Sequence, residues 1–192
     1  MASAQAGAGE ARPQRDGRAW LYAVAVAAAV IAADQLAKAA VRSSITPGEE
    51  RRFLPGIELV NTRNHGVAFG LNVGGAAGVT VLIGLALVIL LAYFARHLRE
   101  PLIWLPTGML IGGAVGNVLD RLRAGSVTDF VKLPLGWPPF NLADAAITFG
   151  ILALYLVIER GRARERADRD DRDGGEPAAK PRGGEPGGGA PR

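Results

Sequence analysis

Two aspartates in the second half of the chain each lie within an apolar stretch. Asp129 is embedded in Val-Thr-Asp-Phe-Val, and Asp144 is followed by Ala-Ala-Ile. The dipole of a helix that starts near residue 142 would explain Asp144 alone, but it does not explain Asp129. Two carboxylates in a poorly solvated site do not both ionise readily, so one pKa rises and the pair shares a proton. The pattern therefore indicates a site in which Asp129 and Asp144 act together.

Such a pair can hydrolyse a peptide bond, and we predict neither a metal ion nor a cofactor. One carboxylate acts as general base on a water molecule while the other, protonated, polarises the carbonyl, and the two titrate as a unit. Cysteine is absent, which excludes a cysteine nucleophile and thiolate zinc sites. Ser126 has no base nearby in the sequence, so serine catalysis fits poorly. The residue types favour aspartic peptidase chemistry.

Further polar residues interrupt the apolar sequence at its boundaries. Asp34 and Lys38 are four residues apart, in the order that suits a helical ion pair. They are either a snorkelling pair that ends the helix or a support for the site. Asn117, Asp120 and Arg121 follow a later apolar block. We expect a structural role for all three, with Asp120 and Arg121 as a charge pair that locks the site.

Four apolar blocks are long enough to cross a membrane as helices. About 20 helical residues, each rising about 1.5 Å, cover a hydrocarbon layer of about 30 Å. We predict an all-α membrane protein with four transmembrane helices, at residues 20–40, 75–95, 102–119 and 142–158.

The segments between and around these spans are polar. Residues 41–74 contain the strand-like Gly-Ile-Glu-Leu-Val at 56–60, and we expect a small β-containing extramembrane cradle there. Residues 120–141 form a second, shorter connection on the same side. We predict that residues 19–159 are one four-span domain between two disordered ends, 1–18 and the Gly/Pro-rich, charged 160–192.

The distribution of arginine predicts the orientation. Arginines precede span one, occupy the turn between spans two and three, and follow span four, so both termini are expected in the cytoplasm. The opposite side also carries basic residues, among them Arg42, Arg51, Arg52, Arg123 and Lys132. This topology gathers the carboxylates near the bilayer at the outer face. It places His65 and His97 on opposite sides of the membrane, against a His-centred site.

Two features have alternative interpretations. Span one, with its preceding arginines and the triplet Ala37-Lys38-Ala39, imitates a cleavable signal peptide, although Asp34 and Lys38 are unusual in a cleavage region. Gly108, Gly112 and Gly116 recur every four residues, which favours close helix packing over an approach path for a substrate helix.

Five motifs, in order, resemble the lipoprotein signal peptidase (signal peptidase II) family over residues 20–158. They are Asp34-Gln-Leu-Ala-Lys38, Asn64-His-Gly-Val-Ala-Phe69, Gly112-Gly-Ala-Val-Gly-Asn-Val-Leu-Asp-Arg121, Gly125-Ser-Val-Thr-Asp-Phe130 and Phe140-Asn-Leu-Ala-Asp144.

The resemblance implies an inner-membrane aspartyl endopeptidase of bacteria, with its site at the extracytoplasmic face. Its substrates would be prolipoproteins cleaved just before a diacylglyceryl-modified cysteine. The family's catalytic pair maps to Asp129 and Asp144. The supporting residues map to Asp34, Lys38, Asn64, Asn117, Asp120, Arg121 and Asn141. We expect membrane lipids as further partners, no nucleic acid and a monomer; the net charge of +4 is weak support for nucleic-acid binding because much of it lies in the tail.

Two other functions compete with this interpretation. A small transporter or channel would relay ions through membrane carboxylates, but it predicts polar residues at the middle of the bilayer, where spans two and four are apolar. A structural subunit with Gly-lined docking helices predicts that Asp129→Asn has no effect.

Overall fold

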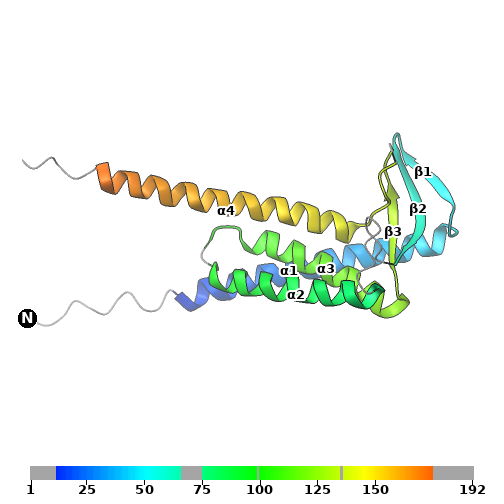
Figure 1. Cartoon of the computed structure of the whole chain (residues 1–192), viewed down its shortest axis with the longest axis horizontal. Coiled ribbons are helices and arrows are strands. Elements are labelled where there is room, and N and C mark those ends of the chain that lie inside the picture. Colours follow the sequence, from blue (N-terminus) through cyan, green and yellow to red (C-terminus); the bar gives the residue numbers. More distant parts are fainter. Residues whose placement is uncertain (1–11, 66–74, 99, 135, 175–192) are drawn as a thin grey trace, which may run out of the picture. The chain divides into compact units, whose positions relative to one another are not determined.

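The computed structural model describes residues 12–65, 75–98, 100–134 and 136–174. The elements follow in the order α1 (Arg12–Ser44), β1 (Glu50–Leu54), β2 (Ile57–Asn64), α2 (Gly75–Arg96), α3 (Trp104–Ala124), β3 (Val127–Lys132) and α4 (Leu142–Gly174). Met1–Ile158 form one compact unit and Glu159–Arg192 a second. In the first unit α3 packs against α1 and α2, and the sheet lies at one end of these helices (Figure 1). We call this the sheet end.

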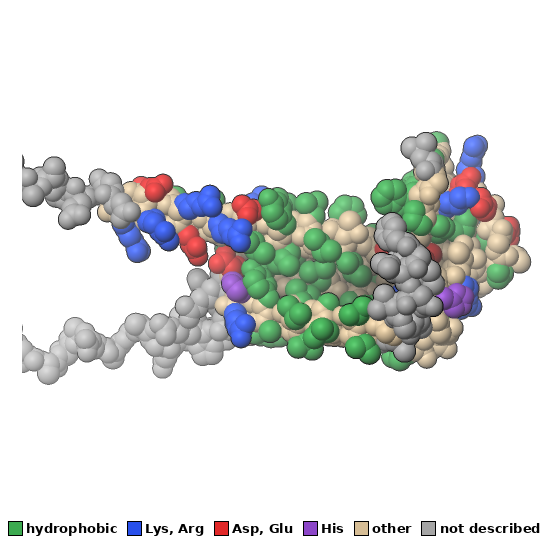
Figure 2. All heavy atoms as spheres, viewed as in Figure 1, with side chains coloured by type: hydrophobic (Ala, Val, Ile, Leu, Met, Phe, Trp, Pro, Cys, Tyr) green, Lys and Arg blue, Asp and Glu red, His purple; other side chains and the backbone are tan. Residues whose placement is uncertain are grey.

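Apolar side chains cover the outside of the helices. Two helical segments, Gly17–Ser44 and Leu142–Arg172, are long and apolar enough to cross a membrane, and Val81–Arg96 is a shorter apolar helix. Large apolar side chains on α2 and α4 are exposed, and Figure 2 shows them as a green band over the helices. An exposed apolar surface of this extent marks contact with lipid. The protein is therefore a mostly helical membrane protein, and the two remaining spans stay a prediction.

Glycines allow α3 to approach α1 closely. A Cβ atom on Gly108 would lie 2.6 Å from the carbonyl oxygen of Ala23, and one on Gly112 would lie 2.8 Å from that of Ala27. No side chain fits at such separations without a shift of the backbone. The interpretation of the glycine stripe as a close-packing surface is confirmed.

An apolar cluster holds the helices together at the end away from the sheet. Ala23 of α1, Phe94 of α2 and Ile103 before α3 are buried there, and Leu154 and Val157 of α4 pack against them. The cluster therefore brings together residues of α1, α2 and the middle of α4 with the residue that precedes α3.

The sheet is antiparallel with strand order β1-β2-β3. Residues Pro55 and Gly56 turn β1 into β2, and Gly56 adopts a φ of +78° that favours glycine. Strand β3 pairs with β2, with Thr62 opposite Asp129. The β structure expected in residues 41–74 is present as β1 and β2, and the second connection adds β3, which was not predicted. Val127 to Phe130 are all buried, so the strand lacks the alternation of apolar and polar residues that reveals a half-exposed strand.

The helices extend beyond the expected boundaries at both ends of the chain. Helix α1 begins at Arg12 and α4 continues to Gly174, so the prediction of disorder is wrong for residues 12–18 and 160–174. Arg, Ala and Glu dominate residues 160–167 and are good helix formers, and an existing helix is extended far more easily than a new one is started. Residues 1–11 and 175–192 lie outside the described part of the chain.

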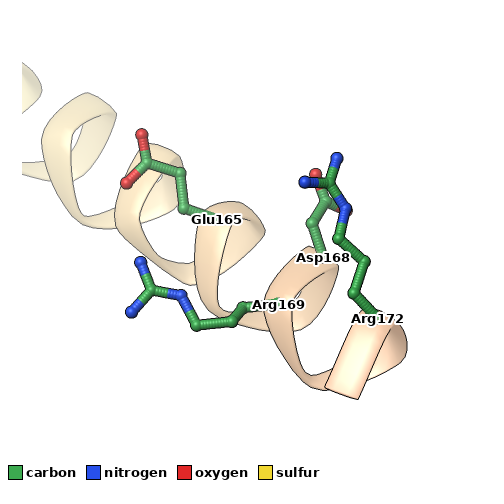
Figure 3. Close-up of a pocket in the computed structure, with 4 residues that line it drawn as sticks. All are labelled: Glu165, Asp168, Arg169 and Arg172. Atoms are coloured by element: carbon green, nitrogen blue, oxygen red, sulfur yellow. The ribbon is translucent and has the colours of Figure 1, made fainter. Parts of the chain in front are cut away.

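The last turns of α4 are charged rather than apolar. Arg162 pairs with Glu159 at 3.0 Å. Figure 3 shows a surface pocket lined by Glu165, Asp168, Arg169 and Arg172, all from this one helix. Acidic and basic side chains alternate along these turns at helical spacing, which is the pattern of a solvated helix.

Candidate active site

A capping box at the start of α4 fixes Asp144. The side-chain oxygen of Asn141 accepts the Asp144 backbone N–H at 2.9 Å, and Asp144 Oδ2 accepts the Asn141 backbone N–H at 3.2 Å. The sequence Asn-Leu-Ala-Asp places a capping residue three positions before an acid, which is the spacing that this reciprocal arrangement needs. Asp144 therefore has a defined position in the first turn, where the helix dipole stabilises negative charge.

Asn141 also joins Asp144 to Asp129. Its Nδ2 donates to Asp129 Oδ1 at 2.7 Å, in a buried hydrogen bond. The other oxygen of Asp129 accepts from Asn64 Nδ2, at the end of β2, at 2.9 Å. The structure thus brings Asp129, Asp144, Asn64 and Asn141 together from β2, β3 and the start of α4. The remainder of the second motif, residues 66–69, lies outside the described residues.

Asn117 connects the pair to a buried cation. Its Nδ2 donates to Asp144 Oδ1 at 2.8 Å, and its Oδ1 accepts from Lys38 Nζ at 2.9 Å. Because the amide gives its donor to the carboxylate and its acceptor to the ammonium, its orientation is determined. Lys38 therefore orients Asn117, which in turn holds Asp144.

Lys38 is the centre of a fully buried charge cluster. Its Nζ lies 2.8 Å from Asp34 Oδ2 and 3.1 Å from Asp120 Oδ2, and both Asp34 and Lys38 have 0% of their side-chain surface exposed. A snorkelling pair would keep the ammonium in water, so that interpretation is wrong. Buried charges require such pairing, and the pairing here joins α1 to α3.

The two carboxylates of this cluster position the elements that carry Asp129 and Asp144. Asp34 Oδ1 accepts the backbone N–H of Ala143, in the first turn of α4, at 3.0 Å. Asp120 Oδ2 accepts the backbone N–H of Thr128, next to Asp129, at 3.1 Å. A displacement of either carboxylate would therefore move α4 or β3.

Gln35 and Gly116 also serve this cluster, and the sequence interpretation assigned neither of them there. Gln35 Nε2 lies 3.2 Å from Asp120 Oδ1 and 3.2 Å from the carbonyl oxygen of Gly116. A Cβ atom on Gly116 would lie 2.9 Å from Asp34 Oδ2, so this glycine makes room for the carboxylate. The sequence signal that could have assigned Gln35 to this cluster is its position directly after Asp34.

Arg121 does not form the expected ion pair with Asp120, whose cationic partner is Lys38. Its Nη1 donates to the carbonyl oxygen of Asn117 at 3.3 Å. Its Nε is buried and has no hydrogen-bond partner among the described residues. The guanidinium interacts electrostatically with Asp144 and Asp129 as well as Asp120, so Arg121 belongs to the surroundings of the aspartate pair.

Burial raises the pKa of the Asp129 carboxyl above its ordinary value of 3.8. The nearby charge of Asp144 raises this pKa further, while the hydrogen bonds from Asn64 and Asn141 and the charge of Lys38 oppose the shift. Asp129 is only 3% exposed, so desolvation of the charged form is the main cause. The environment therefore favours a proton on Asp129.

An apolar cavity of about 490 Å³ reaches Asp144. Its other lining residues include Trp137, Phe140 and Phe149, from the connection before α4 and from α4 itself. This volume falls within the range of about 300–1,000 Å³ that is common for ligand sites. An apolar substrate segment in this cavity would lie beside Asp144.

Ser126 and the histidines lie outside this arrangement. The Ser126 hydroxyl contacts the carbonyl oxygen of Ala124 at 3.4 Å. His97 Nδ1 lies 2.8 Å from the carbonyl oxygen of Tyr93 at the end of α2, whereas His65 directly follows β2 at the sheet end. Figure 2 shows the histidine side chains at opposite ends of the helices.

Two aspartates linked through Asn141 at the sheet end of an apolar helical protein fit the site of a membrane aspartic peptidase. A family model described as signal peptidase (SPase) II matches residues 26–159. The chain belongs to the signal peptidase II family and is a peptidase. Membership in a peptidase family decides against the transporter and structural-subunit alternatives.

Individual relatives agree with the family. A lipoprotein signal peptidase of Moorella thermoacetica is 43% identical over 129 residues, which cover 65% of this chain and 84% of the relative. One from Syntrophomonas wolfei is 41% identical over 139 residues, which cover 71% of this chain and 93% of the relative.

Solved structures of bacterial membrane enzymes share the fold. One, determined by the in meso method at 1.9 Å resolution, has a TM-score of 0.66 at 24% identity and covers 71% of this chain and 91% of that one. Another, at 2.3 Å, has a TM-score of 0.64 at 23% identity and covers 82% and 94%.

Proposed function

We propose that this peptidase removes signal peptides from diacylglyceryl-modified prolipoproteins, with Asp129 and Asp144 as its catalytic pair. The observation that carries the assignment is the direct link through Asn141, whose Nδ2 donates to Asp129 Oδ1 and whose backbone N–H donates to Asp144 Oδ2. The names of the similar proteins support the substrate class.

The surroundings of the pair suggest which aspartate holds the proton. Asp129, whose pKa is raised, is the acid, and Asp144, in the first turn of α4, is the base. Asp144 takes a proton from water as the water oxygen bonds to the scissile carbonyl carbon, and Asp129 gives its proton to the carbonyl oxygen. When the C–N bond breaks, Asp144 protonates the leaving amine and a hydroxyl of the intermediate returns a proton to Asp129. Both carboxyls are then in their starting states.

The surrounding residues position this pair and do not react. Asn64, Asn117 and Asn141 orient the two carboxylates, while Lys38, Asp34 and Asp120 hold the elements that carry them. Arg121 lies near the pair and carries a buried Nε without a partner among the described residues. In this role each residue affects the rate through the geometry of Asp129 and Asp144.

The membrane brings the substrate to the correct depth. In our proposal four helices span the bacterial inner membrane, both termini are cytoplasmic, and a monomer presents the aspartate pair at the outer boundary. The signal peptide crosses the bilayer as a helix, and the lipid chains of the modified cysteine hold the scissile bond at that boundary. Apolar binding far from the reacting atoms thus contributes to positioning, and the apolar cavity beside Asp144 suits an apolar substrate segment.

Incubation of the purified protein with a lipidated precursor tests the proposal. Mass mapping of the products should show one cut, directly before the lipidated cysteine. The matched control is the same precursor without the diacylglyceryl group, for which turnover should be much slower. A cut at another peptide bond, or equal turnover of both precursors, would contradict the substrate assignment.

A further inference from the structure

Three arginines from separate elements line one small cavity at the sheet end. Arg42 lies in the last turn of α1, Arg63 near the end of β2 and Arg123 in the last turn of α3. The cavity has a volume of about 220 Å³, and its other lining residues include Asp120 and Thr128. The residues are far apart in the sequence, so the fold brings their positive charges together.

The acidic group in this cavity does not neutralise the arginines. Asp120 is 3.1 Å from Lys38, whereas its distance to Arg42 Nη1 is 4.0 Å. Arg42 Nη1 instead donates to the Thr128 hydroxyl at 3.1 Å, and Arg123 Nη1 donates to the neutral Gln35 at 2.9 Å.

Two guanidinium groups thus retain uncompensated charge. Within the described part of the chain, no carboxylate lies within ion-pair distance of Arg63 or Arg123. Both side chains are exposed. The cavity is therefore cationic and accessible.

The cavity lies where apolar surface gives way to charge. Leu122, directly before Arg123, is 74% exposed, and Leu36 on α1 is 71% exposed. Helix dipoles account for basic residues in the last turns of α1 and α3, but Arg63 lies on a strand. Exposed leucines beside arginines are typical of a surface at the level of lipid headgroups.

We propose that this cavity binds the phosphate of an anionic phospholipid headgroup. Guanidinium groups match phosphate oxygens through paired hydrogen bonds, and the exposed Leu122, directly before Arg123, suits the start of an acyl chain. Thr128, whose backbone N–H donates to Asp120, directly precedes Asp129 on β3. A bound headgroup would therefore also stabilise the strand that carries Asp129, so that lipid composition influences the enzyme. The proposal does not depend on the identity of the peptidase substrate.

Thermal unfolding of the purified full-length protein in a neutral detergent tests the site. Phosphatidylglycerol should raise the Tm in a saturable manner, and phosphatidylcholine should raise it less. In the double variant Arg63→Ala/Arg123→Ala, phosphatidylglycerol should raise the Tm no more than phosphatidylcholine does. The matched control, Arg51→Ala/Arg52→Ala, removes the same charge from β1 outside this cavity. In this control, phosphatidylglycerol should still raise the Tm more than phosphatidylcholine.

Two further measurements keep the test decisive if the double variant folds poorly. Native mass spectrometry of the unaltered protein should show one phosphatidylglycerol retained in preference to phosphatidylcholine. The single variant Arg63→Gln, at an exposed strand position, should weaken that retention.

Several outcomes would overturn the proposal. If the Tm shift with phosphatidylglycerol falls equally in the two double variants, the lipid is attracted by the general positive charge of the protein and not by this cavity. A full Tm shift with inorganic phosphate alone would assign the cavity to a free anion, and stronger stabilisation by a soluble acidic peptide would assign it to a protein segment.

Discussion

Four aspartates at the sheet end divide into two sets according to their partners. Asp34 and Asp120 are paired with the ammonium of Lys38. Asp129 and Asp144 are held by asparagine amides and a backbone N–H. No lysine or arginine of the described residues lies within ion-pair distance of this second set.

The difference separates structural carboxylates from chemically active ones. The shared ammonium of Lys38 holds Asp34 and Asp120 in place, so both carboxylates suit a fixed role in joining elements. Neutral amides can hold a carboxylate in place while leaving it free to gain or lose a proton. Substitutions in the two sets should therefore have different consequences.

Asp129→Asn and Asp144→Asn should each abolish precursor cleavage while the protein still inserts and accumulates. Each substitution preserves the size of the side chain but removes its proton transfer, which is worth about 10²- to 10⁴-fold in rate. Single-turnover assays of the purified variants measure the effect, with Tm values to show that both are folded. Retained cleavage by either variant would place it in the structural set.

Lys38→Met should reduce stability more than any other single change in the cluster. It leaves two buried carboxylates without their cation, and breaking a buried ion pair costs about 3–5 kcal/mol. Unfolding in detergent measures the loss. The matched control is Lys132→Met, whose pairs with Glu50 and Glu58 are exposed and whose removal should change stability little. Equal behaviour of the two variants would contradict the structural role of Lys38.

Gly113→Ala should weaken the packing that seats α4 beside the site. A Cβ atom there would lie 2.5 Å from the carbonyl oxygen of Ala143, and overpacking of this kind costs about 1–3 kcal/mol. Gly84→Ala in α2 is the control, because a Cβ atom there meets nothing within 4 Å and alanine favours a helix. The Tm should fall for the first variant and stay or rise for the second.

Stability should fall as pH rises through the pKa of Asp129. The pKa of this carboxyl is raised in the folded protein above its ordinary value of 3.8. Its stabilising contribution is therefore complete below about pH 3.8 and is lost as the folded group ionises. Asp129→Asn should remove this part of the pH dependence and be the more stable form at neutral pH. If the Tm of the unaltered protein and that of Asp129→Asn change with pH in the same way, the pKa of Asp129 is not raised.

Deletion of residues 165–192 should leave cleavage unchanged. The deleted part lies within the second unit and contributes none of the residues around Asp129 and Asp144. Turnover of the truncated enzyme in detergent provides the measurement, and a loss of turnover there would show that the tail supports the site.

The sequence predicted the membrane class, the family and the proximity of the polar motifs, because apolar blocks and intramembrane acids are strong local signals. It did not predict strand β3, whose buried residues do not alternate. It also missed the position of Lys38 between Asp34 and Asp120, since the contact joins residues about 80 positions apart and helical spacing reports only the nearer partner. Helix ends at Arg12 and Gly174 were missed because charge was taken for disorder.

Infrared difference spectroscopy of the purified enzyme tests the raised pKa of Asp129. A protonated-carboxyl band that disappears in Asp129→Asn and persists in Glu49→Gln should titrate above the ordinary pKa of 3.8. If no such band titrates above that value, or if the band remains in Asp129→Asn, the proposed division between the two sets of aspartates is wrong.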